Sequence, residues 1–421
     1  MYTSFMQNSR HSISEMQMSS MTIRLTIECH AHRENHPRQI MKSYVMRAIV
    51  PLLCFAMLFF SCHEESSPRI SSQTIIVLMP WSDNLKPFFD NNIDDMAEAI
   101  AEGILADERV VACVATSPQK ALFIELRGEG GVCKRDTLHV FSDINFTASS
   151  CLVQLLAFVE RNATAHHYAM IVGGHGMAWL PTGSMPARSP RRQPETQPMT
   201  RWIGGFANDT QIEISTLADG IRLSGLHMDY ILFDDCYMSS VEVVYELRDV
   251  TDYVVGCPTE IMAYGFPYHH CLRHLKGNVN YLQLCEAFYS FYSQYKIPCG
   301  AISVTDCGQL DALAEAARAI NSRAEEIGPK GDIQATDGFN PPLFYDLGDT
   351  FRHLCTDTIL LGIFMKQLEK AVPFKTSTDY YFSSYGGYQK INHFSGLNTS
   401  QSSINPVASS WIFTKWYQDT H

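Results

Sequence analysis

A cysteine and a histidine in this chain each follow a short apolar segment directly. Cys236 closes residues 230–236, where a mostly apolar run leads into two aspartates. His175 follows the apolar residues 168–174 and is flanked by glycines. A thiol with an imidazole beside it can transfer acyl groups, because imidazole takes and returns a proton near neutral pH. The pair therefore predicts nucleophilic catalysis if the fold brings the two side chains together.

Each of the two residues also has a simpler interpretation. Cys236 alone could be a buried free cysteine, and His175 alone could be a structural residue of a glycine-rich turn. A helix is expected to open near Ser239, and a helix N-terminus favours a thiolate. If both side chains are catalytic, the backbone N–H groups of Gly176 and Cys236 could stabilise an oxyanion.

The elements around this pair alternate between buried strands and amphipathic helices. Strands are expected at 74–81, 109–116, 121–126, 168–174, 229–236, 252–258 and 301–306, and helices at 92–105, 150–163, 214–225, 240–249, 281–295, 309–326 and 356–370. Ser215 is expected to cap the helix 214–225. The tail from Asp379 is expected to form short strands and loops. The alternation predicts an α/β fold with a mostly parallel sheet and helices on both faces, in which active groups gather beyond the carboxyl ends of the strands.

Composition and charge restrict the class of protein. The chain has 421 residues, of which 46 % are hydrophobic and 18 % charged, as in an ordinary globular protein of one or two domains. Its net charge of −12 argues against a nucleic-acid partner. The cysteines show no CxxC pair and no regular spacing, so the sequence predicts neither a metal site, nor a disulfide framework, nor a thiol redox protein. Most of them are expected to be buried apolar residues.

The N-terminal region has the pattern of an export signal. Lys42 and Arg47 precede an apolar run at 48–60, which is too short for a comfortable membrane span. The run stops at Ser61 and Cys62, and a small residue before cysteine resembles a bacterial lipobox. We expect lipid on Cys62 and a lipoprotein anchored in the cell envelope, in the outer membrane. The alternative is a plain signal peptide with a chance cysteine.

These signals divide the chain into four parts. Met41 is the expected start, so residues 1–40 would be a non-native or disordered extension. Residues 41–61 are the expected signal peptide, and residues 62–73 the linker. The remainder, 74–421, is the expected catalytic region.

Several segments together resemble one protein family. They are "TIIVLMPWSDNL", "YAMIVGGHGMAW", "ILFDDCYMSSVEVVYEL", "YVVGCPTEIMAYGFPY" and "LFYDLGDTF". In this order they resemble the clostripain (C11) family of caspase-like cysteine peptidases, over about residues 74–416. The resemblance implies a three-layer αβα sandwich, with a core at about 74–310 and C-terminal helices and short strands at about 311–421. It also implies an endopeptidase that acts as a monomer on proteins or peptides and cuts after Arg or Lys, with His175 as base and Cys236 as nucleophile.

The resemblance further assigns a substrate pocket. Asp234 would form its floor, because a carboxylate pairs well with Arg or Lys, although a strand-end Asp commonly bonds a neighbouring backbone N–H instead. Glu260 would line the pocket or be a solvated loop residue. The chain departs from the family pattern in having Asp235 before the cysteine, Cys257 in place of a usual serine, and Ala178 in place of a common glycine. These departures leave open a second function, that of an inactive caspase-like surface binding or scaffold protein.

No cofactor is expected. Some relatives in the family require calcium, and the scattered Asp and Asn residues of this chain form no recognisable calcium loop.

The segment 181–202 is rich in proline and arginine and has no apolar periodicity, so an exposed loop is expected there. It begins six residues after His175. An enzyme that cuts after Arg would find Arg188 and Arg192 in its own loop, which predicts self-cleavage at one of them. The alternative is a passive surface insertion.

Overall fold

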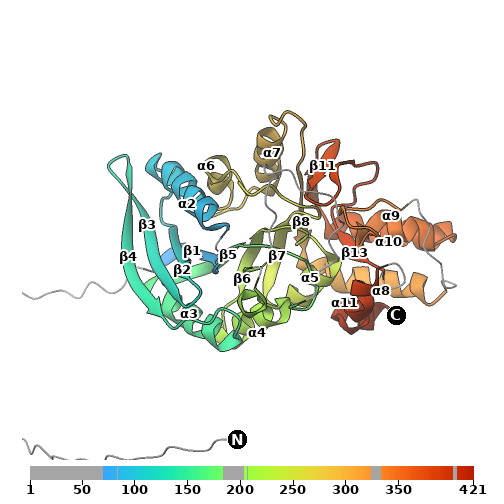
Figure 1. Cartoon of the computed structure of the whole chain (residues 1–421), viewed down its shortest axis with the longest axis horizontal. Coiled ribbons are helices and arrows are strands. Elements are labelled where there is room, and N and C mark those ends of the chain that lie inside the picture. The colour runs from blue at the N-terminus through green and yellow to red at the C-terminus, as the bar shows by residue number, and fades with distance from the viewer. Residues whose placement is uncertain (1–69, 83, 184–202, 206, 324–332, 402–404) are drawn as a thin grey trace, which may run out of the picture. The chain divides into compact units, whose positions relative to one another are not determined.

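The computed structural model describes residues 70–421, apart from residues 83, 184–202, 206, 324–332 and 402–404 (Figure 1). The described residues belong to one unit, Ser67–His421. The predicted extension, signal peptide and lipidated Cys62 lie outside the described residues. So do Arg188 and Arg192.

A nine-stranded sheet forms the centre of this unit, in the order β10-β8-β7-β6-β5-β1-β2-β3-β4. The five middle strands are mutually parallel: β1 (Ser71–Met79), β2 (Arg109–Ser117), β5 (Ala165–Gly173), β6 (Met228–Asp234) and β7 (Thr251–Gly256). Two antiparallel strands extend each edge: β3 (Lys120–Glu129) and β4 (Val132–Ser142) on one side, β8 (Ala301–Asp306) and β10 (Phe374–Ser377) on the other. The prediction of a mostly parallel sheet is therefore confirmed.

The central strands form because their apolar runs can be buried on both faces. Ile75 and Val77 of β1, Ile171 of β5 and Leu232 of β6 have no exposed surface. Parallel strands covered on both faces read as continuous apolar runs rather than as alternating ones. β4 differs, since most of its residues are exposed, and no strand was predicted there. Its pairing along the whole of β3, and not an apolar pattern, defines it.

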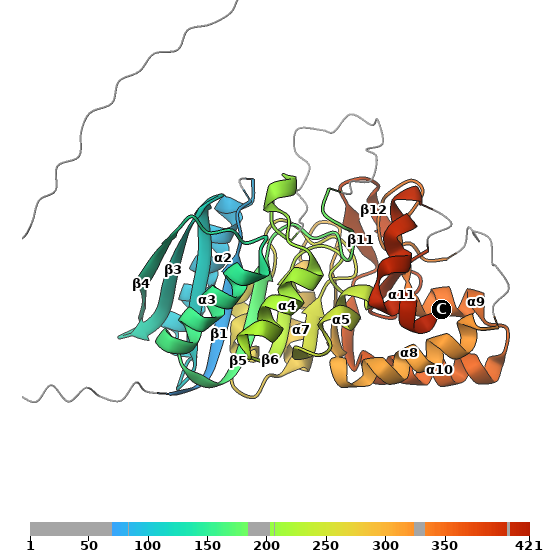
Figure 2. The ribbon, with the colours of Figure 1, turned by 90° about the horizontal axis from the view of Figure 1, so that it is seen from below.

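Helices cover both faces of the sheet (Figures 1 and 2). One face carries α2 (Lys86–Ala101), α6 (Tyr268–Cys271) and α7 (Tyr281–Tyr292), and the other carries α3 (Ser149–Asn162), α4 (Ile214–Ser224) and α5 (Val241–Leu247). Short 3-10 turns connect them: η1 (Asn208–Thr210), η2 (Leu272–His274) and η3 (Cys307–Gln309). The result is the predicted three-layer arrangement.

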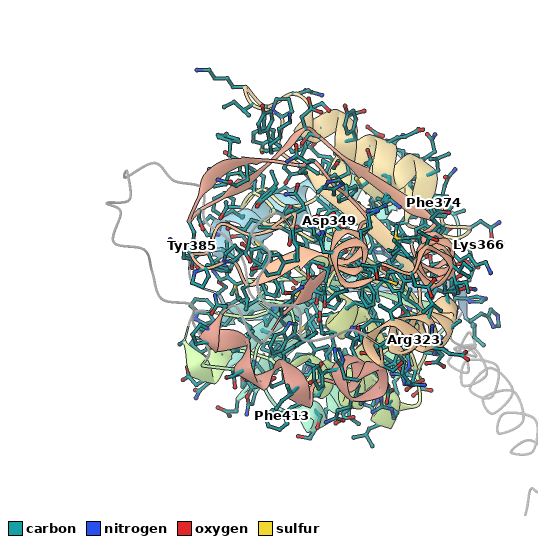
Figure 3. The ribbon with its side chains drawn as sticks, turned by 90° about the vertical axis from the view of Figure 1, so that its right-hand side faces the viewer. Arg323, Asp349, Lys366, Phe374, Tyr385 and Phe413 are labelled. Carbon is teal, nitrogen blue, oxygen red and sulfur yellow. The ribbon has the colours of Figure 1, made fainter. Side chains whose placement is uncertain are left out.

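The C-terminal part packs beside the β8 end of the sheet. It contains α8 (Leu310–Asn321), α9 (Leu347–Leu354), α10 (Thr358–Ala371), η4 (Pro406–Phe413) and α11 (Lys415–Thr420), with the short strands β9 (Phe344–Asp346), β11 (Tyr380–Ser383), β12 (Gly387–Lys390) and β13 (Asn398–Ser400). Figure 3 faces this part, with Asp349 near its middle and Phe413 at its margin. The exposed fractions agree, since Asp349 is 1 % exposed and Phe413 73 %.

Several predicted elements differ from those in the structure. α2 begins at Lys86 rather than at residue 92, because the proline at its first turn suits a helix start. Glu213, not Ser215, is the N-cap residue of α4. β6 ends at Asp234, so Cys236 lies beyond the strand instead of closing it. The tail contains helix α11 in addition to the predicted strands, and this helix packs against α5 and α8.

Candidate active site

The pairing of β5 with β6 sets the relative positions of His175 and Cys236. These two strands are parallel neighbours, as predicted, and Gly173 is the partner of Asp234. His175 lies two residues beyond Gly173, and Cys236 lies two residues beyond Asp234. Both residues therefore leave the same edge of the sheet at the same level, on adjacent strands.

Gly176 brings the two segments into main-chain contact. A Cβ added at this glycine would lie 2.3 Å from the carbonyl oxygen of Cys236 and 3.0 Å from its nitrogen. No real side chain tolerates such distances, so only glycine permits this approach. The segment after His175 thus packs directly on the main chain of Cys236, where the sequence predicted two oxyanion-binding N–H groups.

The thiol of Cys236 contacts the segment that connects β7 to α6, residues 257–267. The N–H of Ile261 donates to Sγ at 3.4 Å, and Sγ lies 3.7 Å from the carbonyl oxygen of Ile261. A backbone N–H directed at sulfur stabilises the thiolate, which is the reactive form of a cysteine. Cys236 and His175 are both fully buried.

Asn84 is a site residue that the sequence analysis missed. Its Oδ1 lies 3.0 Å from Nε2 of His175, and the hydroxyl of Ser82 donates to the same oxygen at 3.0 Å. Both residues follow β1, which pairs with β5. The signal was available, since "SDN" is a polar cluster at the end of a third buried strand of the same sheet.

Two residues near the pair have left-handed backbone conformations. Tyr237 follows the candidate nucleophile with φ of 62°, and Ala178 has φ of 51°. Such a conformation costs a residue with a side chain about 1–2 kcal/mol, which explains why the family resemblance leads one to expect glycine at 178. Tyr237 is held by its N–H, which donates to Thr259, and by its hydroxyl, which donates to Glu260. The backbone and the side chain of Tyr237 thus both hold the turn that carries Cys236 in place.

Asp234, the predicted pocket floor, is fully buried. Its Oδ1 accepts from the N–H of Phe266 at 3.1 Å, and its Oδ2 accepts from the hydroxyl of Tyr268 at 3.1 Å. A Cβ on Gly265 would lie 2.3 Å from both oxygens, so that glycine packs on the carboxylate. The carboxylate thus organises the β7–α6 segment. Its role toward substrate stays a prediction.

Glu260 is 4 % exposed and is not a solvated loop residue. Its carboxylate accepts from the hydroxyl of Tyr237 at 2.7 Å, from the hydroxyl of Ser383 at 2.5 Å and from the N–H of Ser384 at 2.9 Å. Burial raises the pKa of Glu260, and these hydrogen bonds oppose the rise. Glu260 therefore ties the turn after Cys236 to the C-terminal part.

The other thiols of the described residues are mostly buried, as predicted. Burial raises the pKa of Cys299 to about 11 and that of Cys285 to about 12. It raises the pKa of Cys113, Cys271 and Cys307 as well. These thiols stay protonated at neutral pH, which is typical of apolar core residues.

Neither a metal-binding cluster nor a membrane-spanning helix is found in the described part of the chain. No group of three or more His, Cys, Asp or Glu side chains there could hold a metal ion. Within the same residues, no helix has the length and apolar character needed to cross a membrane.

A buried α/β sheet with a cysteine and a histidine beyond neighbouring parallel strands defines the class of caspase-like cysteine proteases. The clostripain family model (peptidase C11) matches residues 77–410, and the chain belongs to this family and is a cysteine protease.

Solved structures agree with this assignment. A secreted C11 cysteine protease from Bacteroides thetaiotaomicron, "iotapain", is 42 % identical with a TM-score of 0.78, over 84 % of this chain and 100 % of that one. An inactive zymogen C11 protease from Parabacteroides distasonis is 25 % identical with a TM-score of 0.72, over 84 % and 99 %. A clostripain from B. thetaiotaomicron in complex with a peptide inhibitor is 47 % identical with a TM-score of 0.51, over 52 % and 99 %. A search of curated proteins found no match.

Proposed function

We propose that this protease hydrolyses peptide bonds after Arg or Lys, with Cys236 as nucleophile and His175 as general base and acid. The observation that carries the proposal is the Gly173–Asp234 pair, which sets the two side chains at one level beyond adjacent strands. The main-chain contact of Gly176 with Cys236 supports it.

The reaction follows from these positions. His175 takes the proton of the Cys236 thiol, and the sulfur attacks the carbonyl carbon of the scissile bond. The resulting oxyanion lies near the N–H groups of Gly176 and Cys236, which stabilise it. His175 then gives the proton to the leaving amine, and the C–N bond breaks. Water, deprotonated by His175, hydrolyses the thioester and releases the free thiol.

Specificity for basic residues rests on Asp234 in this proposal, with Glu260 as a second acid nearby. A buried carboxylate pairs with a Lys or bidentately with an Arg side chain. The inhibitor bound to the B. thetaiotaomicron clostripain is named BTN-VLTK-AOMK, and its peptide letters end in K, the code for lysine. This supports cleavage by the present protease after a basic residue of its substrate.

Self-cleavage at Arg188 or Arg192 is part of the same proposal. Full burial of His175 and Cys236 supports a precursor that must rearrange before a substrate reaches the thiol. One relative is described as an inactive zymogen. The chain that aligns in the clostripain complex matches 52 % of this chain, although 99 % of its own length is aligned. A fragment of a cleaved relative would align in this way. Mass spectrometry of the native chain and of Cys236→Ala tests this step: an intact active enzyme, or identical cleavage of both proteins, contradicts it.

Export and lipid anchoring through Cys62 are also proposed. The similar protease iotapain is described as secreted, which supports export. Metabolic labelling with a radioactive fatty acid tests the anchor. The native chain should carry the label and Cys62→Ala should not, and an unlabelled native chain contradicts the anchor.

The proposed activity is tested by turnover of fluorogenic peptides that end in Arg, Lys or a neutral residue. The native chain should cleave only the first two, and Cys236→Ala and His175→Ala should cleave none while keeping a native melting temperature. A folded native chain that binds peptides but never cleaves them would favour the alternative, an inactive binding or scaffold protein.

A further inference from the structure

A cavity lies among α2, the β7–α6 segment and the end of α7. Figure 1 shows α2, α6 and α7 on one face of the sheet. The volume of the cavity is about 640 Å³. The residues that line it come from α2, from the β7–α6 segment and from the end of α7 and the loop after it: Asn91, Asn92, Asp94, Asp95, Tyr264, Phe266, Pro267, Phe291, Gln294 and Tyr295. None of the residues assigned to the reaction above lines this cavity.

Asn92 lines the cavity and has a side-chain acceptor without a donor among the described residues. The residue is 2 % exposed, and its Nδ2 donates to the carbonyl oxygen of Tyr264 at 2.9 Å. This bond fixes the amide orientation and leaves Oδ1 as the other polar atom. Oδ1 is buried and has no hydrogen-bond partner among the described residues. A buried acceptor without a donor is costly, so a ligand that brings an N–H donor to Oδ1 would remove this cost.

Two carboxylates add negative charge to the same wall. Asp94 is exposed and pairs with Arg135 across 2.5 Å. Asp95 is half-buried, and no ion pair to it is found among the described residues. Burial raises the pKa of Asp95, Glu98 adds to the rise, and His269 and His270 oppose it. A cation beside Asp95 would reverse that effect of burial.

Aromatic rings also line the cavity. Tyr264 is 59 % exposed and packs edge-on against Phe88, with ring centroids 5.6 Å apart. Tyr295 and Phe291 also pack edge-on against one another, at 5.9 Å. The faces of such rings attract ammonium and guanidinium groups. An acceptor, a carboxylate and aromatic rings together fit a cationic group that carries several N–H donors.

The cavity lies within reach of a bound substrate. Ile261 contacts the sulfur of Cys236, and Tyr264 lines the cavity three residues further along the same segment. Three residues span at most about 10 Å. An extended peptide held at Cys236 therefore reaches the cavity with a residue close to the cleaved bond.

We propose that this cavity binds the side chain of a second Lys or Arg of the substrate, near the one that Asp234 recognises. The inference rests on the proposed function, because it takes the peptide to lie across Cys236. Binding in this cavity makes the enzyme selective for substrates with paired or clustered basic residues, and Asn92 and Asp95 determine this preference.

Peptide binding to the native protein, inactivated after any self-cleavage by alkylating Cys236 with a small uncharged reagent, tests the inference without catalysis. The probes are fluorescein-labelled peptides with one fixed Arg, and matched peptides in which a Lys replaces alanine at each neighbouring position in turn. We expect one Lys-containing peptide to bind about tenfold more tightly than the single-Arg peptide, by fluorescence anisotropy. Adding Asp95→Asn should remove this tenfold preference and leave binding of the single-Arg peptide unchanged.

Control variants separate this role from general effects. Asp90→Asn removes a carboxylate from the same helix at a position outside the cavity and should keep the preference. Asn92→Ala should reduce the preference, with a melting curve to show that the protein is folded. The inference is overturned if no second Lys improves binding, if Asp95→Asn weakens all peptides equally, or if millimolar calcium displaces the preferred peptide, which would assign the cavity to a metal ion.

The proposed function fails in a different experiment. If the native chain does not cleave after Arg or Lys, the assignment of Asp234 is wrong, whereas the anisotropy ratio still decides the role of the cavity.

Discussion

The amide oxygen of Asn84 lies 3.0 Å from Nε2 of His175, at the ends of two paired strands. An amide oxygen only accepts hydrogen bonds, so the ring proton is on Nε2 and the basic nitrogen of the neutral ring is Nδ1. Ser82 donates to the same oxygen and holds the amide in this orientation. Asn84 is therefore a positioning residue that selects the tautomer of the proposed base.

Replacing Asn84 tests this role. Asn84→Ala should lower kcat about tenfold or more, because the imidazole loses its orientation and its fixed tautomer. KM should change little, because the proposed role of Asn84 concerns the base and not the binding of substrate. Asn84→Asp keeps an acceptor at this position and should recover part of the rate, with a shifted pH–rate profile. If both variants match the native enzyme in kcat and in pH profile, the positioning role is wrong.

The contact of Gly176 with Cys236 gives a second prediction. Gly176→Ala places a Cβ 2.3 Å from a backbone oxygen that cannot move aside freely. A displacement of about 1 Å at the reacting groups can cost a hundredfold in rate, so we expect at least that loss in peptide turnover.

Gly362→Ala is the matched control for Gly176→Ala. Gly362 is in α10, and nothing lies within 4 Å of a Cβ added there. This variant should keep full turnover and gain up to about 1 kcal/mol in unfolding free energy, because alanine favours helix. Equal activity of the two variants would show that close approach at Gly176 does not matter.

Asp234 has a structural and a proposed catalytic role, and two variants separate them. Asp234→Asn should reduce cleavage after Arg and Lys far more than it reduces alkylation of Cys236 by a small uncharged reagent. Tyr268→Phe removes a hydrogen bond to Asp234 but keeps its charge, and should cost about 1 kcal/mol of stability with basic specificity retained. Equal losses of cleavage and alkylation in Asp234→Asn would indicate a structural role instead.

The buried carboxyl of Asp337 predicts a pH dependence of stability. Burial raises its pKa to about 7, against hydrogen bonds from Phe339, Leu343 and Phe344 and with a further rise from Glu260. Between pH 4 and pH 7 the unfolded chain loses this proton while the folded chain keeps it. Asp337 therefore stabilises the fold most at low pH, and its contribution is lost as pH rises through about 7.

Urea unfolding at several pH values measures this contribution. Asp337→Asn should be less stable at every pH, because an amide N–H₂ would face backbone donors. Its free energy of unfolding should also decrease less between pH 4 and pH 7 than that of the native chain. If the free energy of unfolding changes with pH by the same amount in both proteins, Asp337 does not titrate in this range.

The sequence predicted the central sheet because its parallel strands carry apolar runs that only burial explains. Strand order placed His175 and Cys236 at one edge, and the Gly173–Asp234 pair confirms the adjacency of their strands. β4 and α11 could not be predicted in the same way. β4 is mostly exposed and exists through its ladder with β3, and α11 is stabilised by packing against distant helices.

Site details that depend on three-dimensional packing were also out of reach. Nothing in the spacing of Glu260 shows that Ser383 and Ser384, more than a hundred residues away, donate to its carboxylate. The same holds for Asn92, whose unused acceptor is visible only in the folded chain. Asn84 is different, since a polar cluster after a buried strand could have been recognised.

The most direct test of the Cys236–His175 assignment is covalent labelling by a peptide chloromethyl ketone that ends in Arg, followed by intact-mass measurement and peptide mapping. We expect one adduct per active chain, on Cys236, with slow labelling of His175→Ala and none of Cys236→Ala. An adduct on another cysteine, or equal labelling rates for the native chain and His175→Ala, would contradict this assignment.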